Sequence, residues 1–324
     1  MAPSSLTKFD APHLSFKNLK HTSFCKMTTL QQEITLKPSP LRISTHVVTS
    51  SFKAKMDLDK LYRILYTRLI PIWYPGEGIL KMEHGDTILG SSDRDCFTNR
   101  DISEHTFHNQ STIVLRREHK PGQWKESNVK LFANGSLQMT GVPSVEFATE
   151  TLEWLLLEIK KLPEVPFTDP TETPQLQEIS VKLINTDYFI NALIKRDMLF
   201  QILVNRYSIF SINEKTIYQG VNAKYYFNKA NTARPGICAC KARCRGQGTG
   251  DGDGECKRVT LCIFQDGKII VTGARTMEQI NEAYHFLNMV LQDNAKEVLR
   301  PMPAAPIKAA PEAPAALAAI PVKA

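Results

Sequence analysis

Two stretches of the chain alternate apolar and polar positions in the same way. The first is VKLFANGSLQMTGVPS (129–144) and the second is TLCIFQDGKIIVTGART (260–276). Each begins as an alternating run, turns at a glycine and resumes the alternation, which is typical of a β-hairpin. The matching positions are Phe132, Gly135, Thr140 and Gly141 in the first stretch and Phe264, Gly267, Thr272 and Gly273 in the second. The chain therefore contains an internal repeat.

A long amphipathic helix is predicted after each hairpin. Apolar residues recur at helical spacing over 148–162 and over 280–291, which favours helices with one buried face. Ser144 is a helix start directly after Pro143, and Thr276 with Gln279 forms a capping box.

Each half also opens in the same way. The predicted strands are 43–52, 111–117, 179–190 and 223–228, and the predicted short helices are 58–65 and 194–203. A strand, a short helix, several strands and a long helix, present twice, indicate an α+β fold with a curved antiparallel sheet and helices on one face.

Three segments without sustained periodicity mark the boundaries of the repeats. The predicted organisation is a flexible basic arm at 1–40, a first repeat at 41–162, a Pro-rich linker at 163–177, a second repeat at 178–300 with a Cys-rich insertion at 229–258, and a disordered Pro/Ala tail at 301–324.

One face of such a sheet has no helix to cover it. In the hairpins, one set of alternating residues is uniformly apolar, namely Leu131, Leu137 and Met139, and Ile263, Ile269 and Val271. We expect that set to meet the helices, which places Phe132 and Phe264 on the uncovered face. Large exposed aromatic residues favour a binding surface; the alternative is that the linker, the arm or a second chain covers this face.

Composition and charge narrow the functional classes. The chain has 324 residues, of which 42% are hydrophobic, so collagen-like and fully disordered chains are excluded. No apolar run approaches the length of a membrane span. The net charge is +7, but residues 41–300 contain 33 basic and 30 acidic residues, so a nucleic-acid partner is permitted without strong phosphate attraction. The seven cysteines are expected to be intracellular thiols or metal ligands.

The hairpins resemble those of the TATA-binding protein family. The family motif is nearly intact in IFQDGKIIVTGAR (263–275), is eroded in LFANGSLQMTGVP (131–143), and its opening strand and helix resemble VVTSSFKAKMDLDKL (47–61). The resemblance implies two repeats that form a saddle, whose concave sheet binds the minor groove of A·T-rich double-stranded DNA with phenylalanine wedges. It also implies recruitment of basal transcription factors or RNA polymerase through the convex helices, in a nucleus or a viral transcription compartment. The divergence suggests a protist or large-DNA-virus member.

The same resemblance implies roles for individual residues. The DNA-binding positions are the wedges Phe132 and Phe264, the groove-facing Thr140 and Thr272 with Ile270 and Cys262 beside them, and the phosphate-proximal Lys268 and Arg275. In the family, a second phenylalanine precedes the strand before each hairpin. This chain has Asn109 and Val221 at the corresponding places, and Phe107 is the nearby substitute. The family's opening-strand asparagine falls near Thr45 and Asn185, and Lys130 and Gln138 make the first face more polar.

Four cysteines form the pattern C-x-C-x3-C-x11-C in the insertion, at Cys238, Cys240, Cys244 and Cys256. Four thiolates are ligands for a structural zinc; the alternative is a surface insertion without metal. Residues 229–258 contain seven basic and three acidic residues, a balance that suits phosphate contact.

Other chemistry is not indicated. Counting a calcium loop from Asp251 places Cys262 where a glutamate is required, His105 and His108 have no nearby metal-ligating partners, and no hydrolase or phosphate-loop motif is present. We therefore expect no enzymatic activity. Two hypotheses remain beside duplex binding: a protein-interaction scaffold with the same fold, and a binder of single-stranded nucleic acid that stacks bases on exposed aromatics.

Overall fold

The computed structural model describes residues 34–96, 109–229, 233–241, 244 and 246–303. The chain divides into two units, Met1–Glu33 and Ile34–Ala324, and all of the described residues belong to the second unit. His105, Phe107 and His108 lie outside the described residues.

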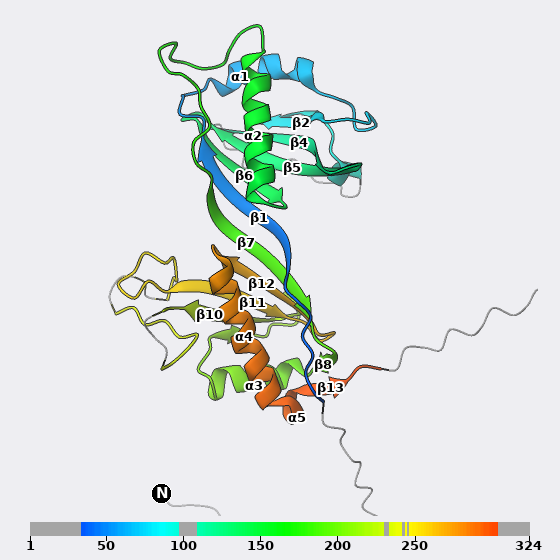
Figure 1. The fold of residues 1–324 in the computed structure, drawn as a ribbon, viewed down its shortest axis with the longest axis vertical. Coiled ribbons are helices and arrows are strands. Elements are labelled where there is room, and N and C mark those ends of the chain that lie inside the picture. The colour runs from blue at the N-terminus through cyan, green and yellow to red at the C-terminus, as the bar shows by residue number, and fades with distance from the viewer. Residues whose placement is uncertain (1–33, 97–108, 230–232, 242–243, 245, 304–324) are drawn as a thin grey trace, which may run out of the picture. The chain divides into compact units, whose positions relative to one another are not determined.

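The elements follow the predicted order in each half (Figure 1). The first half contains β1 (Arg42–Ser51), α1 (Leu58–Leu65), η1 (Tyr66–Arg68), β2 (Gly78–His84), β3 (Thr87–Gly90), η2 (Asp93–Cys96), β4 (Gln110–Lys120), β5 (Gln123–Phe132), β6 (Ser136–Val142) and α2 (Val145–Lys160). The second half contains β7 (Ser180–Phe189), β8 (Ala192–Ile194), α3 (Arg196–Asn205), β9 (Ser211–Ile212), β10 (Val221–Phe227), β11 (Lys257–Ile263), β12 (Lys268–Ala274), α4 (Met277–Asp293), α5 (Ala295–Val298) and β13 (Leu299–Pro301).

Eleven strands form one antiparallel sheet in the order β3-β2-β4-β5-β6-β1-β7-β12-β11-β10-β9. The two opening strands, β1 and β7, are neighbours, with Thr45 opposite Asn185 and Val47 opposite Leu183. The half-sheets therefore join through backbone hydrogen bonds. The predicted α+β fold with an antiparallel sheet is confirmed.

Each half has its own hydrophobic core between the sheet and its helices. In the first half, α1 and α2 pack on the apolar set Leu131, Leu137 and Met139, all at most 1% exposed. In the second half, α3 and α4 pack on Ile263, Ile269 and Val271, which are fully buried. The predicted helix-facing set is confirmed in both repeats.

The hairpin turns explain the repeated glycines. Gly135 and Gly267 have φ angles of +83° and +84°, a region that glycine enters without steric cost. A Cβ at Gly135 would lie 2.2 Å from the carbonyl oxygen of Ala54, and one at Gly267 would lie 2.6 Å from that of Ala192. Both turns therefore need glycine for its backbone angle and for its small size.

The predicted boundaries need two corrections. Residues 34–40, expected to be part of a flexible arm, lie against the second half: the Ser39 amide donates to the carbonyl of Phe189 at 2.8 Å, and Ile34 and Leu36 pack on the core. At the other end, Pro301, expected to be part of the tail, pairs with Ala192 in the small β13–β8 sheet. Both segments are too short to show a period, so only tertiary contacts order them.

The helix caps give a test of the repeated architecture. The Ser144 hydroxyl accepts from the Phe147 amide at 3.1 Å, and the Thr276 hydroxyl accepts from the Gln279 amide at 3.3 Å. We expect Ser144→Ala and Thr276→Ala each to lower the free energy of unfolding by about 1 kcal/mol, because an amide at each helix start loses its partner. Chemical denaturation measures the change, with Thr173→Ala in the exposed linker as the control. Equal stability of the cap and control variants would contradict this role.

Candidate nucleic-acid interface

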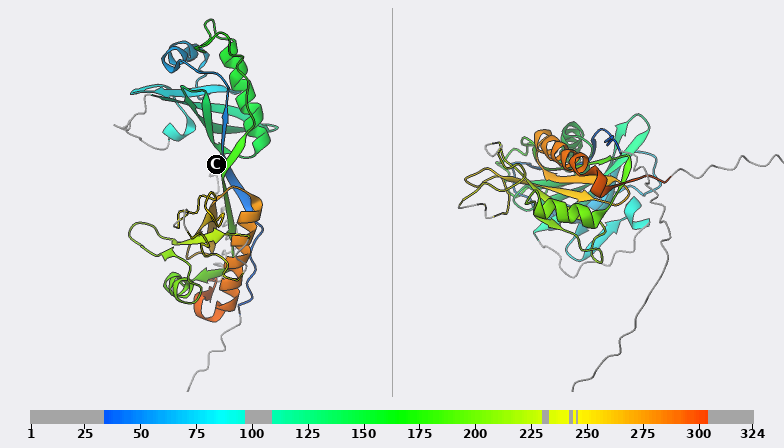
Figure 2. Two further views of the ribbon diagram at one scale, coloured as in Figure 1. Left: turned by 90° about the vertical axis from the view of Figure 1, so that its left-hand side faces the viewer. Right: turned by 90° about the horizontal axis from the view of Figure 1, so that it is seen from below.

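The face of the sheet that points away from the helices, here called the open face, contains the predicted site residues of both hairpins. Figure 2 shows α4 against one side of its strands, with the other side turned away from it. On that other side of the second half lie Phe264, Ile270 and Thr272, all half-buried, and Cys262, which is 8% exposed. Phe132 and Thr140 are likewise half-buried on the first half. Neither phenylalanine is sealed inside a core.

A row of small polar side chains crosses the centre of the open face. The Asn185 amide donates to the Thr45 hydroxyl at 3.1 Å, and the Thr272 hydroxyl donates to the Asn185 side-chain oxygen. Thr272 also pairs across strands with Thr260. Small donors and acceptors can contact the base edges of a minor groove, which display few distinct groups.

An aromatic pair lies on the open face of the second half. The ring of Tyr218 contacts that of Phe264 edge-on, with centroids 5.6 Å apart. Burial, and then interaction of its hydroxyl with Cys262, raises the pKa of Tyr218 to about 12, so the hydroxyl is neutral at ordinary pH. Val221, named as the place for a second aromatic, is fully buried in the core instead. Sequence reasoning missed Tyr218, although an aromatic just before Gly220 and the β10 run was a visible signal.

Charged groups flank the centre of the face. Lys268 lies over the ring of Phe189, 5.8 Å from its centroid. Asp187, which pairs with Ile270 across strands, forms a two-point ion pair with Arg42 at 2.8 and 2.5 Å. The hydrogen bond from Arg42 lowers the pKa of Asp187. This carboxylate therefore stays ionised but paired, which limits its repulsion of an anionic ligand.

The first half presents a more polar surface at its hairpin. Lys130 pairs across strands with Gln138 and with Thr112, and Thr140 pairs with Asn128. Phe132 pairs with Gln110. The predicted polar character of this repeat is confirmed by the register, because these residues all point away from the helices.

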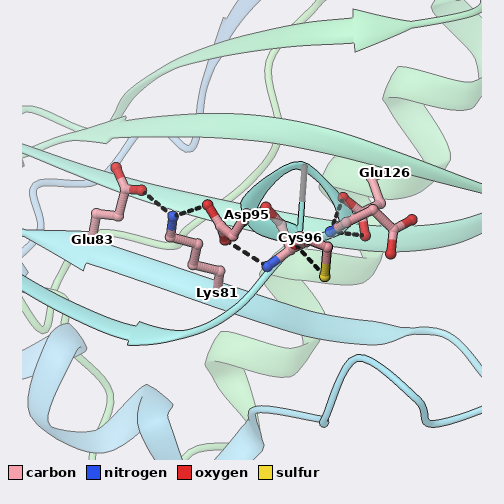
Figure 3. A network of polar contacts seen from close by, with 7 residues as sticks. Lys81, Glu83, Asp95, Cys96 and Glu126 are labelled. Carbon is pink, nitrogen blue, oxygen red and sulfur yellow. Dashed lines mark hydrogen bonds and ion pairs between the residues drawn. The ribbon is translucent and has the colours of Figure 1, made fainter. Parts of the chain in front are cut away.

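The outer strands of the first half are covered on their open face. The Arg116 guanidinium donates to the carbonyls of Ile72 at 2.8 Å, Gly76 at 3.1 Å and Tyr74, which fixes 72–76 over β4. Figure 3 shows Lys81 between Glu83 and Asp95, at 2.9 and 3.0 Å. The Glu126 carboxylate accepts from the Asp93 amide at 3.2 Å. We call residues 72–76 and 92–96 the cover.

The cover changes what the open face can bind. Lys81, Thr112, Val114 and Arg116 are each at most 9% exposed although they point away from the helices. Segments of the first repeat itself therefore cover these outer strands, and not the linker, the arm or a second chain that the sequence alternative named. The central strands and the second half keep exposed polar and aromatic groups.

Cationic groups gather at the outer strands of the second half. Lys224 lies on the open face, donates to Thr260 at 3.1 Å, and has its pKa lowered by burial and by the charge of Arg258. Lys257 has its pKa lowered by burial and by Arg275. The predicted residue Arg275 is exposed and lies beside Gly250 and Lys257. Clustered positive charges of this kind favour an anion such as a phosphate.

Three cysteines of the insertion form one group, and the fourth interacts with two of them. The sulfurs of Cys238, Cys240 and Cys244 lie within 4.8 Å of one another, and the thiol of Cys256 interacts with those of Cys238 and Cys240. This group, here called the cysteine cluster, lies directly before β11.

Comparison with known proteins agrees with the hairpin motif. The family model described as transcription factor TFIID (or TATA-binding protein, TBP) matches residues 254–294. A TATA-box-binding protein-like protein of Acanthamoeba polyphaga mimivirus is 28% identical over 242 residues, which cover 68% of this chain and 60% of the viral protein. The chain is similar to TATA-binding proteins over these residues.

The comparisons also set limits on the relationship. The chain spans less than two thirds of the length of the mimivirus TBP-like protein. Among solved structures, Methanococcus jannaschii TBP matches with a TM-score of 0.42 and 15% identity, over 79% of this chain and 99% of the archaeal one. Within the described ranges, no helix is both long and apolar enough to cross a membrane. The viral relative fits the expectation of a TBP-like protein from a large DNA virus.

The contribution of the cover to stability can be tested through Asp95. Burial alone would raise the pKa of Asp95, but hydrogen bonds from Ser92 and Lys81 lower it below its ordinary value of 3.8. The carboxylate therefore stabilises the fold fully above about pH 5, and this stabilisation is lost as the pH falls through the folded-state pKa. We expect Asp95→Asn to lower the free energy of unfolding by about 1 kcal/mol at pH 7 and by much less in acid.

Chemical denaturation at a series of pH values measures this difference. Glu153→Gln, at an exposed position of α2, is the matched control. The Ser92 amide donates to the Asp95 carboxylate at 2.7 Å, so hydrogen exchange at neutral pH should show faster exchange of this amide in Asp95→Asn than in the native chain. A pH-independent loss of stability would contradict the ion-pair explanation.

Proposed function

We propose that this chain is a TBP-like transcription initiation factor that binds the minor groove of A·T-rich duplex DNA through the open face. The observation that supports this most directly is the pairing of Phe264 with Tyr218 beside the Thr45–Asn185–Thr272 row. An aromatic wedge next to small polar groups matches what minor-groove recognition requires, since the wedge opens a flexible base step while the polar row meets the base edges.

The second half would make most of the contacts. Its open face holds the aromatic pair and Lys224, and Lys257, Arg258 and Arg275 gather where β11 begins and β12 ends. The first half has its outer strands under the cover, so it would contribute mainly Phe132 and Thr140 near the centre. The contact with the duplex is therefore unequal between the two repeats.

The other proposed properties follow from the same role. Helices α2 and α4 carry exposed side chains away from the sheet, including Leu157 and Met289, and are the surfaces offered to basal transcription factors or RNA polymerase. The protein acts by binding, without an enzymatic step, inside the cell in the nucleus or a viral transcription compartment. The proposed cofactor is a structural zinc ion at the cysteine cluster.

A second candidate function is a protein-interaction scaffold that keeps the fold without gripping DNA. The cover favours this candidate, because it removes part of the surface that a duplex would use. Binding of a single-stranded oligonucleotide in preference to a duplex is the third outcome. Titration of labelled A·T-rich, G·C-rich and single-stranded oligonucleotides separates the three hypotheses: preference for A·T-rich duplex supports the proposal, and absence of binding supports the scaffold.

The aromatic pair gives the sharpest test of duplex binding. We expect Phe264→Ala to weaken binding of an A·T-rich duplex at least tenfold, because the wedge that offsets the cost of deforming DNA is removed. Fluorescence anisotropy measures the dissociation constant, and circular dichroism confirms that the variant is folded. Tyr66→Ala, at an exposed aromatic after α1, is the control. If both variants bind like the native chain, the open face is not the DNA site.

The cationic residues predict a defined salt dependence. Each phosphate contact adds about 0.9 to the slope of log affinity against log salt concentration. We expect Lys224→Met and Arg258→Gln each to reduce the slope by about that amount. The control is Lys160→Met at the exposed end of α2, which should leave the slope unchanged. A common change in all three variants would indicate a net-charge effect and not phosphate contact.

A further inference from the structure

The insertion between β10 and β11 contains the cysteine cluster, which duplex binding does not explain. We propose that Cys238, Cys240, Cys244 and Cys256 bind one Zn²⁺ ion as four thiolates, and that this ion holds the insertion in place beside the open face. The proposal concerns a metal site and stands independently of DNA binding.

The sulfur positions fit a tetrahedral ion. Four thiolates bound to zinc at about 2.3 Å lie about 3.8 Å from one another. The Cys238 and Cys244 sulfurs are 3.6 Å apart, and those of Cys238, Cys240 and Cys244 all lie within 4.8 Å of one another. Cys256 completes the set through its interactions with Cys238 and Cys240. Three of the four sulfurs therefore already lie near the spacing that one ion requires.

Nitrogen donors surround the sulfurs. The amides of Ala239, Gly248 and Gly254 donate to the sulfurs of Cys256, Cys244 and Cys240 at 3.1, 3.0 and 3.2 Å. The Asn228 side-chain amide also donates to Cys256, at 3.1 Å. A neutral thiol is only a weak acceptor, whereas a thiolate needs such donors. Hydrogen bonds to the ligand atoms also orient them for a metal.

The backbone wraps closely around the sulfurs because of two glycines. A Cβ at Gly252 would lie 2.8 Å from the Cβ of Cys244 and 3.0 Å from the Cys240 sulfur, and a Cβ at Gly254 would lie 3.0 Å from the same sulfur. Gly252 and Gly254 of the GDGDGE stretch are therefore explained by their close approach to the cysteines, and not by a calcium loop. Asp253, which a calcium loop would use, instead accepts from the Lys241 amide at 2.8 Å.

The donor set selects the ion. Four soft thiolates prefer zinc or iron over the hard ions magnesium and calcium. A closed four-sulfur shell leaves no position for a substrate, so the expected role is structural. The insertion is rich in glycine and charged residues and has little apolar surface of its own, so metal binding supplies the free energy that orders it.

The site lies next to the cationic surface. Cys256 directly precedes Lys257 and Arg258, and the Arg258 amide donates to the carbonyl of Gly248 at 2.8 Å. The Tyr226 hydroxyl donates to the carbonyl of Gly246. A metal held here therefore fixes the start of β11, where the cationic residues Lys257 and Arg258 lie.

The experiment measures metal in the full-length chain without DNA. The protein is purified under reducing conditions and its metals are quantified by mass spectrometry; Co²⁺ is then exchanged into the site and the absorption spectrum recorded. We expect one zinc per chain, and thiolate-to-cobalt charge-transfer bands with the intense visible bands of tetrahedral cobalt. Cys244→Ser combined with Cys256→Ser should lose both signals, while Cys96→Ser, a cysteine of the first half, should keep them.

Several results would overturn the proposal. These are a native chain that binds no zinc when zinc is supplied, bound iron in place of zinc, disulfides among the four cysteines in the reduced preparation, or unchanged zinc in the double variant. The thermal unfolding of the double variant checks that its two hydrophobic cores remain folded. Trypsin should cut the insertion of this variant faster than that of the native chain, and an equal rate would contradict the ordering role.

Discussion

The backbone pairing of β1 with β7 is the constraint on which the rest of the structure depends. These strands open the two halves, and their hydrogen bonds join two half-sheets, each with its own core, into one sheet. Because each half places its long helix on the face that carries the apolar set, the pairing also puts the sides opposite α2 and α4 on one face, part of which the cover closes in the first half. Asn185 reaches both Thr45 and Thr272 only because β7 lies between β1 and β12.

The two halves then use this face differently. In the second half, the turn before β10 brings Tyr218 onto Phe264, and the outer strands present cationic groups. In the first half, Arg116 and Lys81 are turned inward, to backbone carbonyls and to carboxylates of the chain itself. A basic residue engaged in this way is not available to phosphate. The same repeat thus presents an accessible open face in the second half and a face covered by its own chain in the first half.

The low net charge of the repeat region agrees with this division. The cationic groups of the second half are local, at Lys224, Lys257, Arg258 and Arg275, and the cysteine cluster lies at the start of the strand that carries two of these residues. Burial lowers the pKa of Lys224 and Lys257, and the charge of Arg258 lowers the pKa of both further, so Arg258 lies near each of these lysines. A site of this kind depends on the position of its charges more than on their number.

The sequence by itself determined the features that local periodicity encodes. The two hairpins with their glycine turns, the capped helices after them, the helix-facing set such as Leu131 and Ile263, and the grouping of four cysteines could all be predicted, because each depends on residues close together in the chain. The same reasoning placed residues 34–40 in a flexible arm and Pro301 in a disordered tail, since segments this short show no periodicity.

Only the tertiary structure decided which residues meet across strands. Asn185 and Thr45 are 140 positions apart, and Asn185 and Thr272 are 87 apart, so their contact requires the strand order. The position of 72–76 and 92–96 over Arg116 and Lys81, and of Tyr218 against Phe264, depends on how irregular segments fold back onto a finished sheet. Such segments are ordered by side-chain hydrogen bonds and ring contacts to distant residues, and no repeating pattern in the chain records those partners.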